Sequence, residues 1–301
     1  MSNGQTNVPT AVLQEWMLKV LTRKGQFAAD AQLVIARVLE AEIAARTIGG
    51  LASFANILTA IDLGDVDPRA RTLPLIDAPA MAVLDGSTGI GQVGASRAMT
   101  MAIQKSQTTG IALVVVKNSQ PEVDAAGIAA LAAAAGCIGC CVSNWGRAVF
   151  PTQIDGPAWL SSQPHGWAIP HRDRVWTALR RAEDEALPSL ASLNDAFRGV
   201  LSLALTVGLT DSKLPSAKKK SSPFGAGAEH TCIAIHIPSF SVTDSFTRIG
   251  DELAQQAGDG TAGWQLIPVA ALSASVSVNA DVLEALHRVG TESRVPFPTL
   301  V

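Results

Sequence analysis

The chain has 301 residues, which is long enough to bury one large core or two smaller ones. Hydrophobic residues make up 48% of it and charged residues only 16%. So little charge favours a surface that a partner subunit partly covers, as in a homodimer. The net charge of −3 argues against a nucleic-acid-binding protein, which normally presents a basic face.

Neither a secretion signal nor a membrane span is expected. The first nine residues are polar and lack the apolar core of a signal peptide. The longest run of small apolar residues, 125–142, is rich in alanine and interrupted by three glycines, which favours a helix followed by a buried strand. We therefore expect a cytoplasmic protein without a membrane partner.

Helical periodicity opens the chain, and strand-like and helical runs then alternate. Three amphipathic helices are expected at 10–23, 30–46 and 51–63, with Asp30 as the N-cap of the second. The alternation from 72 to 240 favours an α/β lobe, with strands at 81–84, 111–116, 137–142 and 232–237 and helices at 94–107, 126–135 and 196–208. Two more helices are expected at 245–256 and 280–289, separated by an ambiguous β-like run at 269–278.

The cysteines favour a structural role over metal binding. Cys137 and Cys140 have the C-x-x-C spacing of some zinc and redox sites, but no second pair and no nearby His accompany them. With Cys141 they lie in an apolar, strand-like run. We expect them to be buried free thiols, and we expect no metal site.

A glycine turn between a predicted strand and a predicted helix matches G-x-G-x-x-G at residues 89–94. In a Rossmann fold such a turn approaches pyrophosphate, and an acidic residue after the next strand binds the ribose. Here the next strand ends in Lys117 and Asn118, with no acid, and three helices precede the unit. The motif alone is therefore weak evidence for a dinucleotide-binding Rossmann domain.

A set of ordered motifs resembles the malate/L-lactate dehydrogenase-like family, which includes ureidoglycolate and sulfolactate dehydrogenases and Δ1-piperideine-2-carboxylate reductases. The motifs are LDGSTGIGQ at 84–92, GIALVVVKNS at 110–119, G-x-x-x-P at 64–68, GCIG at 136–139, LSSQPHGWAIP at 160–170 and EHTCIAIHIPSF at 229–240. The resemblance implies an α/β, non-Rossmann fold with helical N- and C-terminal lobes around a central mixed sheet. It also implies an NAD(P)-dependent homodimer.

On this basis the chain divides into three parts. Residues 1–71 form an N-terminal helical lobe, and 72–240 form an α/β, cofactor-binding-like lobe that is shortened after 170. Residues 241–301 form a C-terminal helical segment that packs on the N-terminal lobe. No internal repeat is visible.

The chain departs from the family where catalysis is expected. The family's Ser-His-Gly signature, with an Arg three residues later, falls on Ile48, Gly49, Gly50 and Ser53, so both the imidazole and the guanidinium are absent. The second signature, Ser-x-His-Phe-Gly, falls on 119–124, where Glu122 takes the place of the imidazole if the match is counted back from Gly127.

The resemblance leaves a small set of candidate site residues. Glu122 is a candidate general acid if burial raises its pKa, although solvated loop or N-cap roles for Glu122 and Asp124 are the favoured interpretation. Arg198, which stands where the family has a Lys before Gly, is the second candidate catalytic residue. The candidate cofactor contacts are Ser119, Gln163, Pro164 and His230.

Three functional hypotheses follow from this conflict between ancestry and chemistry. The first is an NAD- or NADP-dependent oxidoreductase that acts on a small 2-hydroxy, 2-keto or imino acid with weakened or altered chemistry. The second is a catalytically inactive binding or assembly protein on the same fold. The third is a repurposed non-redox enzyme, such as a lyase or isomerase, because a fold does not determine a function.

Overall fold

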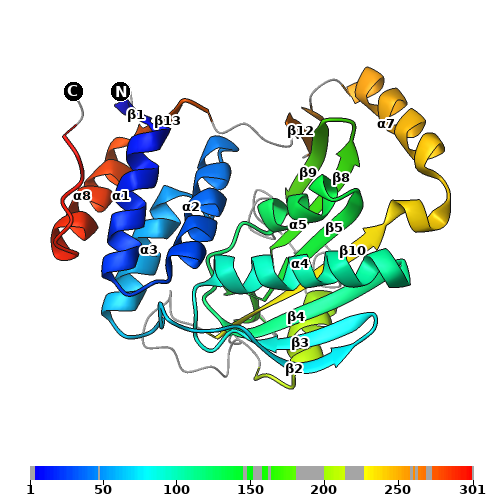
Figure 1. The fold of residues 1–301 in the computed structure, drawn as a ribbon, viewed down its shortest axis with the longest axis horizontal. Coiled ribbons are helices and arrows are strands. Elements are labelled where there is room, and N and C mark those ends of the chain that lie inside the picture. Colours follow the sequence, from blue (N-terminus) through cyan, green and yellow to red (C-terminus); the bar gives the residue numbers. More distant parts are fainter. Residues whose placement is uncertain are drawn as a thin grey trace.

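The protein was analysed as a computed structural model, which describes residues 4–46, 48–144, 148–151, 158–161, 164–180, 200–213, 227–257, 260–261, 264–268 and 273–299. A helical lobe contains α1 (Thr10–Arg23), α2 (Ala28–Ile43), α3 (Leu51–Asp62) and α8 (Ala280–Glu292). Before α1, strand β1 (Gln5–Pro9) pairs antiparallel with β13 (Ser275–Asn279), which precedes α8. The two ends of the chain therefore lie side by side in one lobe (Figure 1).

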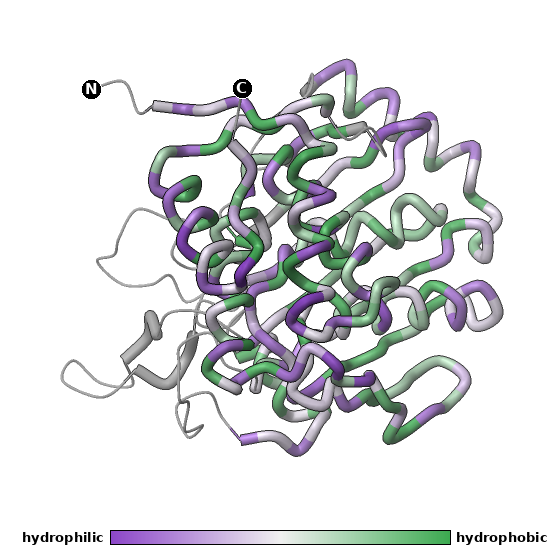
Figure 2. The backbone as a smooth tube through the Cα atoms, turned by 60° about the vertical axis from the view of Figure 1, so that its left-hand side comes forward, coloured by the Kyte–Doolittle hydropathy of each residue, from purple (hydrophilic) through white to green (hydrophobic). Residues whose placement is uncertain are grey.

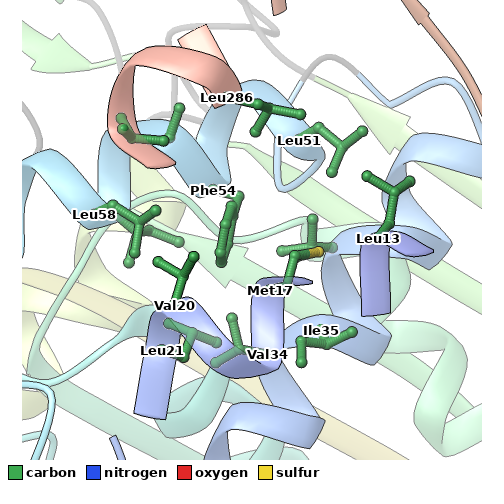
Figure 3. Close-up of a cluster of buried hydrophobic side chains, with 14 of the residues drawn as sticks. Leu13, Met17, Val20, Leu21, Val34, Ile35, Leu51, Phe54, Leu58 and Leu286 are labelled. Carbon is green, nitrogen blue, oxygen red and sulfur yellow. The ribbon is translucent and has the colours of Figure 1, made fainter. Parts of the chain in front are cut away.

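The core of this lobe is apolar and closely packed. Phe54 of α3 lies among aliphatic side chains from α1, α2 and α8 (Figure 3). Trp16 meets the Phe54 ring edge-on, with 5.8 Å between ring centroids, and its indole N–H donates to the Val295 carbonyl at 2.9 Å. Full burial of one such large side chain contributes about 1.5 to 3 kcal/mol, so the C-terminal segment is held to the N-terminal helices by both packing and hydrogen bonding.

The second lobe is built on one large mixed sheet. In the described residues its order is β11-β12-β9-β8-β5-β10-β4-β3-β2, and the parallel pair is β3 (Met81–Asp85) with β4 (Ile111–Ser119). The antiparallel β10 (Ala228–His236) lies between β4 and β5 (Cys137–Ser143). The remaining strands are β2 (Leu73–Ala78), β8 (His165–His171), β9 (Arg174–Arg180), β11 (Gly260–Thr261) and β12 (Trp264–Pro268), and β6 (Ala148–Pro151) and β7 (Ala158–Ser161) form a separate hairpin.

An antiparallel strand between β4 and β5 is incompatible with a Rossmann half, in which successive strands of the βαβ units are parallel. The sheet therefore confirms the non-Rossmann α/β fold.

Helices cover both faces of this sheet. On one face, α4 (Gly91–Thr109) and α5 (Ala125–Ala134) lie next to each other (Figure 1). The Cys232 thiol approaches the Ala95 carbonyl of α4 at 3.6 Å, whereas the adjacent Thr231 hydroxyl donates to the Leu205 carbonyl at 2.6 Å. Because neighbouring strand residues point to opposite faces, the helical segment 200–210, which includes the π-helical turn η2 (Ala204–Gly208), covers the other face.

Helix α7 (Thr243–Ala257), which follows the short 3-10 helix η4 (Ile237–Phe240), lies at the outer end of the sheet (Figure 1). A bidentate ion pair from Arg172 to Asp251, at 2.8 and 2.7 Å, ties it to the β8–β9 turn. Its apolar residues Ile249 and Leu253 are about half exposed. Hydrophilic and hydrophobic segments alternate along the helices of the molecule, as amphipathic packing requires (Figure 2).

The structure corrects several details of the predicted elements. Asp30 is not the N-cap of α2, because the helix begins at Ala28 after Phe27, and Asp30 instead pairs with Arg97 at 2.6 Å. Only the last residues of the ambiguous run 269–278 form a strand, because β13 begins at Ser275. Cys137, Cys140 and Cys141 are buried free thiols in β5, as predicted.

Candidate active site

The glycine turn between β3 and α4 packs against the end of β4 and the residues that follow it. The N–H of Gly86 donates to the Lys117 carbonyl at 2.7 Å, and the N–H of Thr88 donates to the Asn118 carbonyl at 2.8 Å. A Cβ at Gly91 would lie 2.1 Å from the Gln120 carbonyl oxygen. The cavity beside the turn measures about 10 Å³, which is room for a single water. The turn therefore packs against the segment after β4 and does not present a phosphate cradle.

That segment after β4 carries a group of buried polar side chains. We call the following residues the polar cluster: Arg46, Ser53, Asn56, Gln92, Ser119, Gln120, Glu122 and Asp124. Ser119 and Gln120 are fully buried, and Glu122 and Asp124 are 4% and 7% exposed. Five atoms of the cluster are buried without a hydrogen-bond partner: Arg46 Nε, Gln92 Oε1, Ser119 Oγ, Gln120 Nε2 and Glu122 Oε2.

Each such atom costs about 1 to 3 kcal/mol when nothing satisfies it. Buried polar groups in folded proteins are nearly always paired, so a concentration of unpaired ones indicates a place for a polar ligand or ordered water. The cluster offers both donors and acceptors, because it combines an amide and a guanidinium with a carboxylate oxygen.

Glu122 is the titratable centre of the cluster. Its Oε1 accepts a hydrogen bond from Asn56 Nδ2 at 3.0 Å, whereas its Oε2 has no partner. Burial raises the pKa of Glu122 to about 7, and hydrogen bonds from Asn56 and Ser53 oppose the rise. The interpretation of Glu122 as a solvated loop residue is therefore wrong. Its carboxyl group exchanges a proton near neutral pH.

The place of the missing imidazole is closed. Gly49 has a φ of +88°, and a Cβ there would lie 2.8 Å from the Cβ of Asp124. Its N–H donates to the Ser53 hydroxyl at 2.9 Å. Ser53, which stands in place of the missing arginine, is therefore hydrogen-bonded as well. Asp124 caps α5 by accepting from the Ala126 N–H at 3.1 Å, as the N-cap interpretation predicts.

Opposing influences act on the ionisation of Asp124. Burial raises the pKa of Asp124, and the Arg46 guanidinium and two backbone N–H groups act in the opposite direction. The closest approach to Arg46 is 4.0 Å, from Nε to Oδ2, which is longer than a hydrogen bond.

Among the candidate cofactor residues, Pro164 and His230 lie beside Ser119 and Gln120 of the polar cluster. The Ser143 N–H donates to the Pro164 carbonyl at 3.0 Å, and the Ser143 hydroxyl contacts His230 Nδ1 at 2.8 Å. His230 Nε2 then lies 3.1 Å from the Gln120 carbonyl, next to Ser119. Gln163 and Arg198 fall outside the described residues.

Sequence reasoning did not find Arg46, Asn56 or Gln92. Asn56 follows Ser53 by three residues on α3, so helical spacing could have indicated that both face one environment. Arg46 and Gln92 carry no such signal. A loop conformation and a long-range packing contact bring them to the cluster.

Within the described ranges, no group of three or more His, Cys, Asp or Glu side chains is arranged to hold a metal ion. The same part of the chain has no helix that is long and apolar enough to cross a membrane.

The central mixed sheet and the helical lobe formed by both chain ends define a mixed α/β fold. The chain belongs to the malate/L-lactate dehydrogenase family, which matches residues 8–178. Among characterised relatives, it is 32% identical over 152 residues to a malate dehydrogenase of Pyrococcus abyssi. It is 30% identical over 135 residues to an L-sulfolactate dehydrogenase of Methanocaldococcus jannaschii. These alignments span 50% and 45% of this chain but only 42% and 39% of the two relatives.

Solved structures extend the likeness over nearly the whole fold. A malate dehydrogenase of Pyrococcus horikoshii superimposes with a TM-score of 0.82 at 21% identity and covers 99% of this chain and 98% of its own. A Δ1-piperideine-2-carboxylate reductase of Pseudomonas syringae gives 0.74 at 13% identity and covers 98% and 96%. At these identities the likeness establishes the fold alone.

Proposed function

We propose that the chain is an NAD(P)-dependent oxidoreductase that interconverts a small 2-hydroxy acid and its 2-oxo acid, with Glu122 as the group that exchanges the proton. Family membership and the names of the relatives support the reaction class. The observation that carries the proposal is the buried Glu122 carboxyl group, with a pKa of about 7 and an unpaired Oε2.

This carboxyl group is suited to both directions of the reaction. During reduction the protonated form donates its proton to the carbonyl oxygen, and during oxidation the carboxylate takes a proton from the hydroxyl group. A bound nicotinamide supplies or accepts the hydride. A well-placed acid–base group whose pKa lies near the working pH contributes about 10² to 10⁴ in rate.

The unpaired atoms of the polar cluster carry hydrogen-bonding groups of the kind that a nicotinamide carboxamide would need. A carboxamide needs hydrogen-bond donors for its oxygen and acceptors for its NH₂ group, and the cluster offers both in Gln120 Nε2, Ser119 Oγ and Gln92 Oε1. His230 would act indirectly by fixing the Gln120 backbone. Cofactor contacts from Pro164 and Gln163 and a catalytic role for Arg198 remain predictions from the resemblance.

Steady-state assays test this proposal directly. Oxidation of NADH and NADPH would be measured with oxaloacetate, pyruvate and a cyclic imine, for the wild type and Glu122→Gln. We expect turnover in the wild type and a fall in kcat of about 10² to 10⁴ in the variant. The control is Glu252→Gln, which removes an exposed carboxylate on α7. Equal kcat values for Glu122→Gln and the wild type would exclude Glu122 as the proton donor.

A specific observation favours the second candidate, a non-redox or purely binding protein on the same fold. Asp124 fills the place of the family imidazole, and Ser53 replaces its guanidinium. Fluorescence titration with NADH and NADPH separates the two candidates. Absence of binding at millimolar nucleotide supports the second candidate, and saturation supports the first.

We also propose that the protein is a homodimer. Apolar side chains are exposed on and beside α7, with Phe240 at 58% and Leu253 at 51%, and large exposed apolar patches mark interaction surfaces. Light scattering after size exclusion would give twice the chain mass if this is right. A Leu253→Glu variant would then shift toward the monomer.

The three-part division of the chain and its cytoplasmic location stay predictions.

A further inference from the structure

Arg46 is a nearly buried cation whose Nε has no hydrogen-bond partner. Its side chain is 9% exposed, and its Nη2 donates a hydrogen bond to the Thr177 hydroxyl at 2.7 Å. Its Nε is buried without a partner, and the nearest carboxylate, Asp124, stays 4.0 Å away. A guanidinium carries five N–H donors, and a buried charge is retained at low cost only when it is paired and hydrogen-bonded. Arg46 therefore keeps an N–H donor that neither Asp124 nor Thr177 accepts, which leaves it able to bind a further anion.

A chain of contacts connects Arg46 to Glu122. Arg46 faces Asp124, which closes over Gly49. Gly49 donates to the Ser53 hydroxyl, and Ser53 in turn hydrogen-bonds Glu122. The cation and the proton-exchanging group thus flank the position of the missing imidazole.

We propose that the Arg46 guanidinium, held by Thr177, binds the carboxylate of a 2-oxo or 2-hydroxy acid in place of the arginine that Ser53 replaces. This inference rests on the proposed function, because it names the substrate group that the same site receives. Arg46 belongs to the connection between α2 and α3. It lies outside the two segments, 48–53 and 119–124, on which the family's catalytic signatures fall. No motif of the sequence therefore marks it.

The chemistry requires a guanidinium and not merely a positive charge. Arg presents a planar fork that matches the two oxygens of a carboxylate, whereas Lys is a point charge on a flexible stem. Thr177 lies in β9 and is 1% exposed, so the strand fixes one edge of the fork. Asp124 competes for the same cation, and its two backbone donors keep it at α5.

Titration with oxamate tests the inference without turnover. Oxamate carries the carboxylate and carbonyl of a 2-oxo acid, and oxamide, in which a neutral amide replaces the carboxylate, is the matched neutral probe. We expect calorimetric binding of oxamate but not of oxamide. Arg46→Gln should weaken oxamate binding about 10²-fold, because it leaves a carboxylate without its buried partner. Arg46→Lys should weaken it less, and Arg248→Gln on the exposed face of α7 should leave it unchanged.

Asp124→Asn supplies an effect of opposite sign. Asn retains the capping oxygen but removes the charge that competes for Arg46, so oxamate should bind several-fold tighter. If Arg46 served only to compensate Asp124, this variant would leave oxamate affinity unchanged or lower. That result overturns the inference even when Arg46→Gln fails to fold, which circular dichroism would reveal.

Failure of the inference is distinguishable from failure of the proposed function. Turnover of a 2-oxo acid with an unchanged KM in Arg46→Gln would retain the dehydrogenase and eliminate Arg46 as its anchor. Arg46-dependent oxamate binding without any nucleotide oxidation would retain the carboxylate site and eliminate the redox reaction.

Discussion

Helix α3 separates two regions that follow opposite packing rules. Leu51, Phe54 and Leu58 point into the apolar core, where each is fully buried among side chains of the helical lobe (Figure 3). Ser53 and Asn56, on another face of the same helix, contact Gly49 and Glu122 in the polar cluster. The apolar face is closed by contacts within the lobe, whereas the polar face borders atoms without partners. Close packing is therefore concentrated on one side of α3, and buried polar atoms without hydrogen-bond partners lie on the other.

The largest expected effect is on the apolar side. Phe54→Ala should lower the free energy of unfolding by about 4 kcal/mol, because it removes an aromatic ring and leaves a cavity among Trp16 and its neighbours. Urea unfolding at fixed pH measures it. Leu63→Ala, at a position that is 62% exposed, is the control and should change stability by less than about 0.5 kcal/mol. Similar values for the two variants would mean that the helical core is not closely packed.

The second effect lies on the polar side and depends on pH. The pKa of Glu122 is raised from 4.5 to about 7, so the folded protein holds a proton that the unfolded chain releases. This contribution to stability is fully present below pH 4.5 and is lost as pH rises through 7, a difference of about 3 kcal/mol. Unfolding curves between pH 4.5 and 8 measure it.

Glu122→Gln should remove the Glu122 contribution to this pH dependence, so stability should fall less steeply with pH than in the wild type, although Glu40, Glu42 and Asp124 also have raised pKa values. Glu252→Gln, which changes an exposed carboxylate, should keep the wild-type slope. A wild-type stability that does not fall over this pH range would contradict the burial of an ionisable Glu122.

A third effect tests the closure of the imidazole position. Gly49→Ala should cost about 2 kcal/mol, because a positive φ and a 2.8 Å contact with Asp124 act together. Gly64→Ala is a matched control, since Gly64 also has a positive φ but no atom within 4 Å of the added Cβ; it should cost about 1 kcal/mol from backbone strain alone. Equal losses would show that Asp124 does not fill the site. Thermal unfolding at one pH suffices for both.

The fold followed from the sequence more closely than the site did. Periodicity located α1, α3, α4 and α5 within a few residues, because their apolar stripes match the helical repeat. It did not locate β1, which is only five residues long and is formed by pairing with β13 far along the chain. Such pairing depends on tertiary structure, which local pattern does not encode.

For the site, the loop after β4 was identified from motif spacing, and Asp124 was assigned as an N-cap. The burial of Glu122 was not foreseen, since charged residues in a loop are ordinarily solvated. It arises because Asn56 of α3 and Gln92 of α4 close over the loop. Arg46 was invisible for the same reason: its significance lies in contacts with Thr177 and Asp124, at separations of 131 and 78 residues.

The smallest effect concerns the single hydrogen bond between Asn56 of α3 and Glu122 of the polar cluster. The Asn56 amide donates to Glu122 and favours the ionised carboxylate, which lowers the pKa of Glu122 relative to burial alone. Asn56→Ala should therefore move the midpoint of the pH-dependent loss of stability upward, by about half a pH unit for a hydrogen bond worth about 0.7 kcal/mol. Asn279→Ala removes an exposed amide that bonds Gln5 and should leave the midpoint in place. A downward shift in Asn56→Ala would mean that the amide stabilises the protonated acid, and Glu122 would then serve better as a proton donor than as a base.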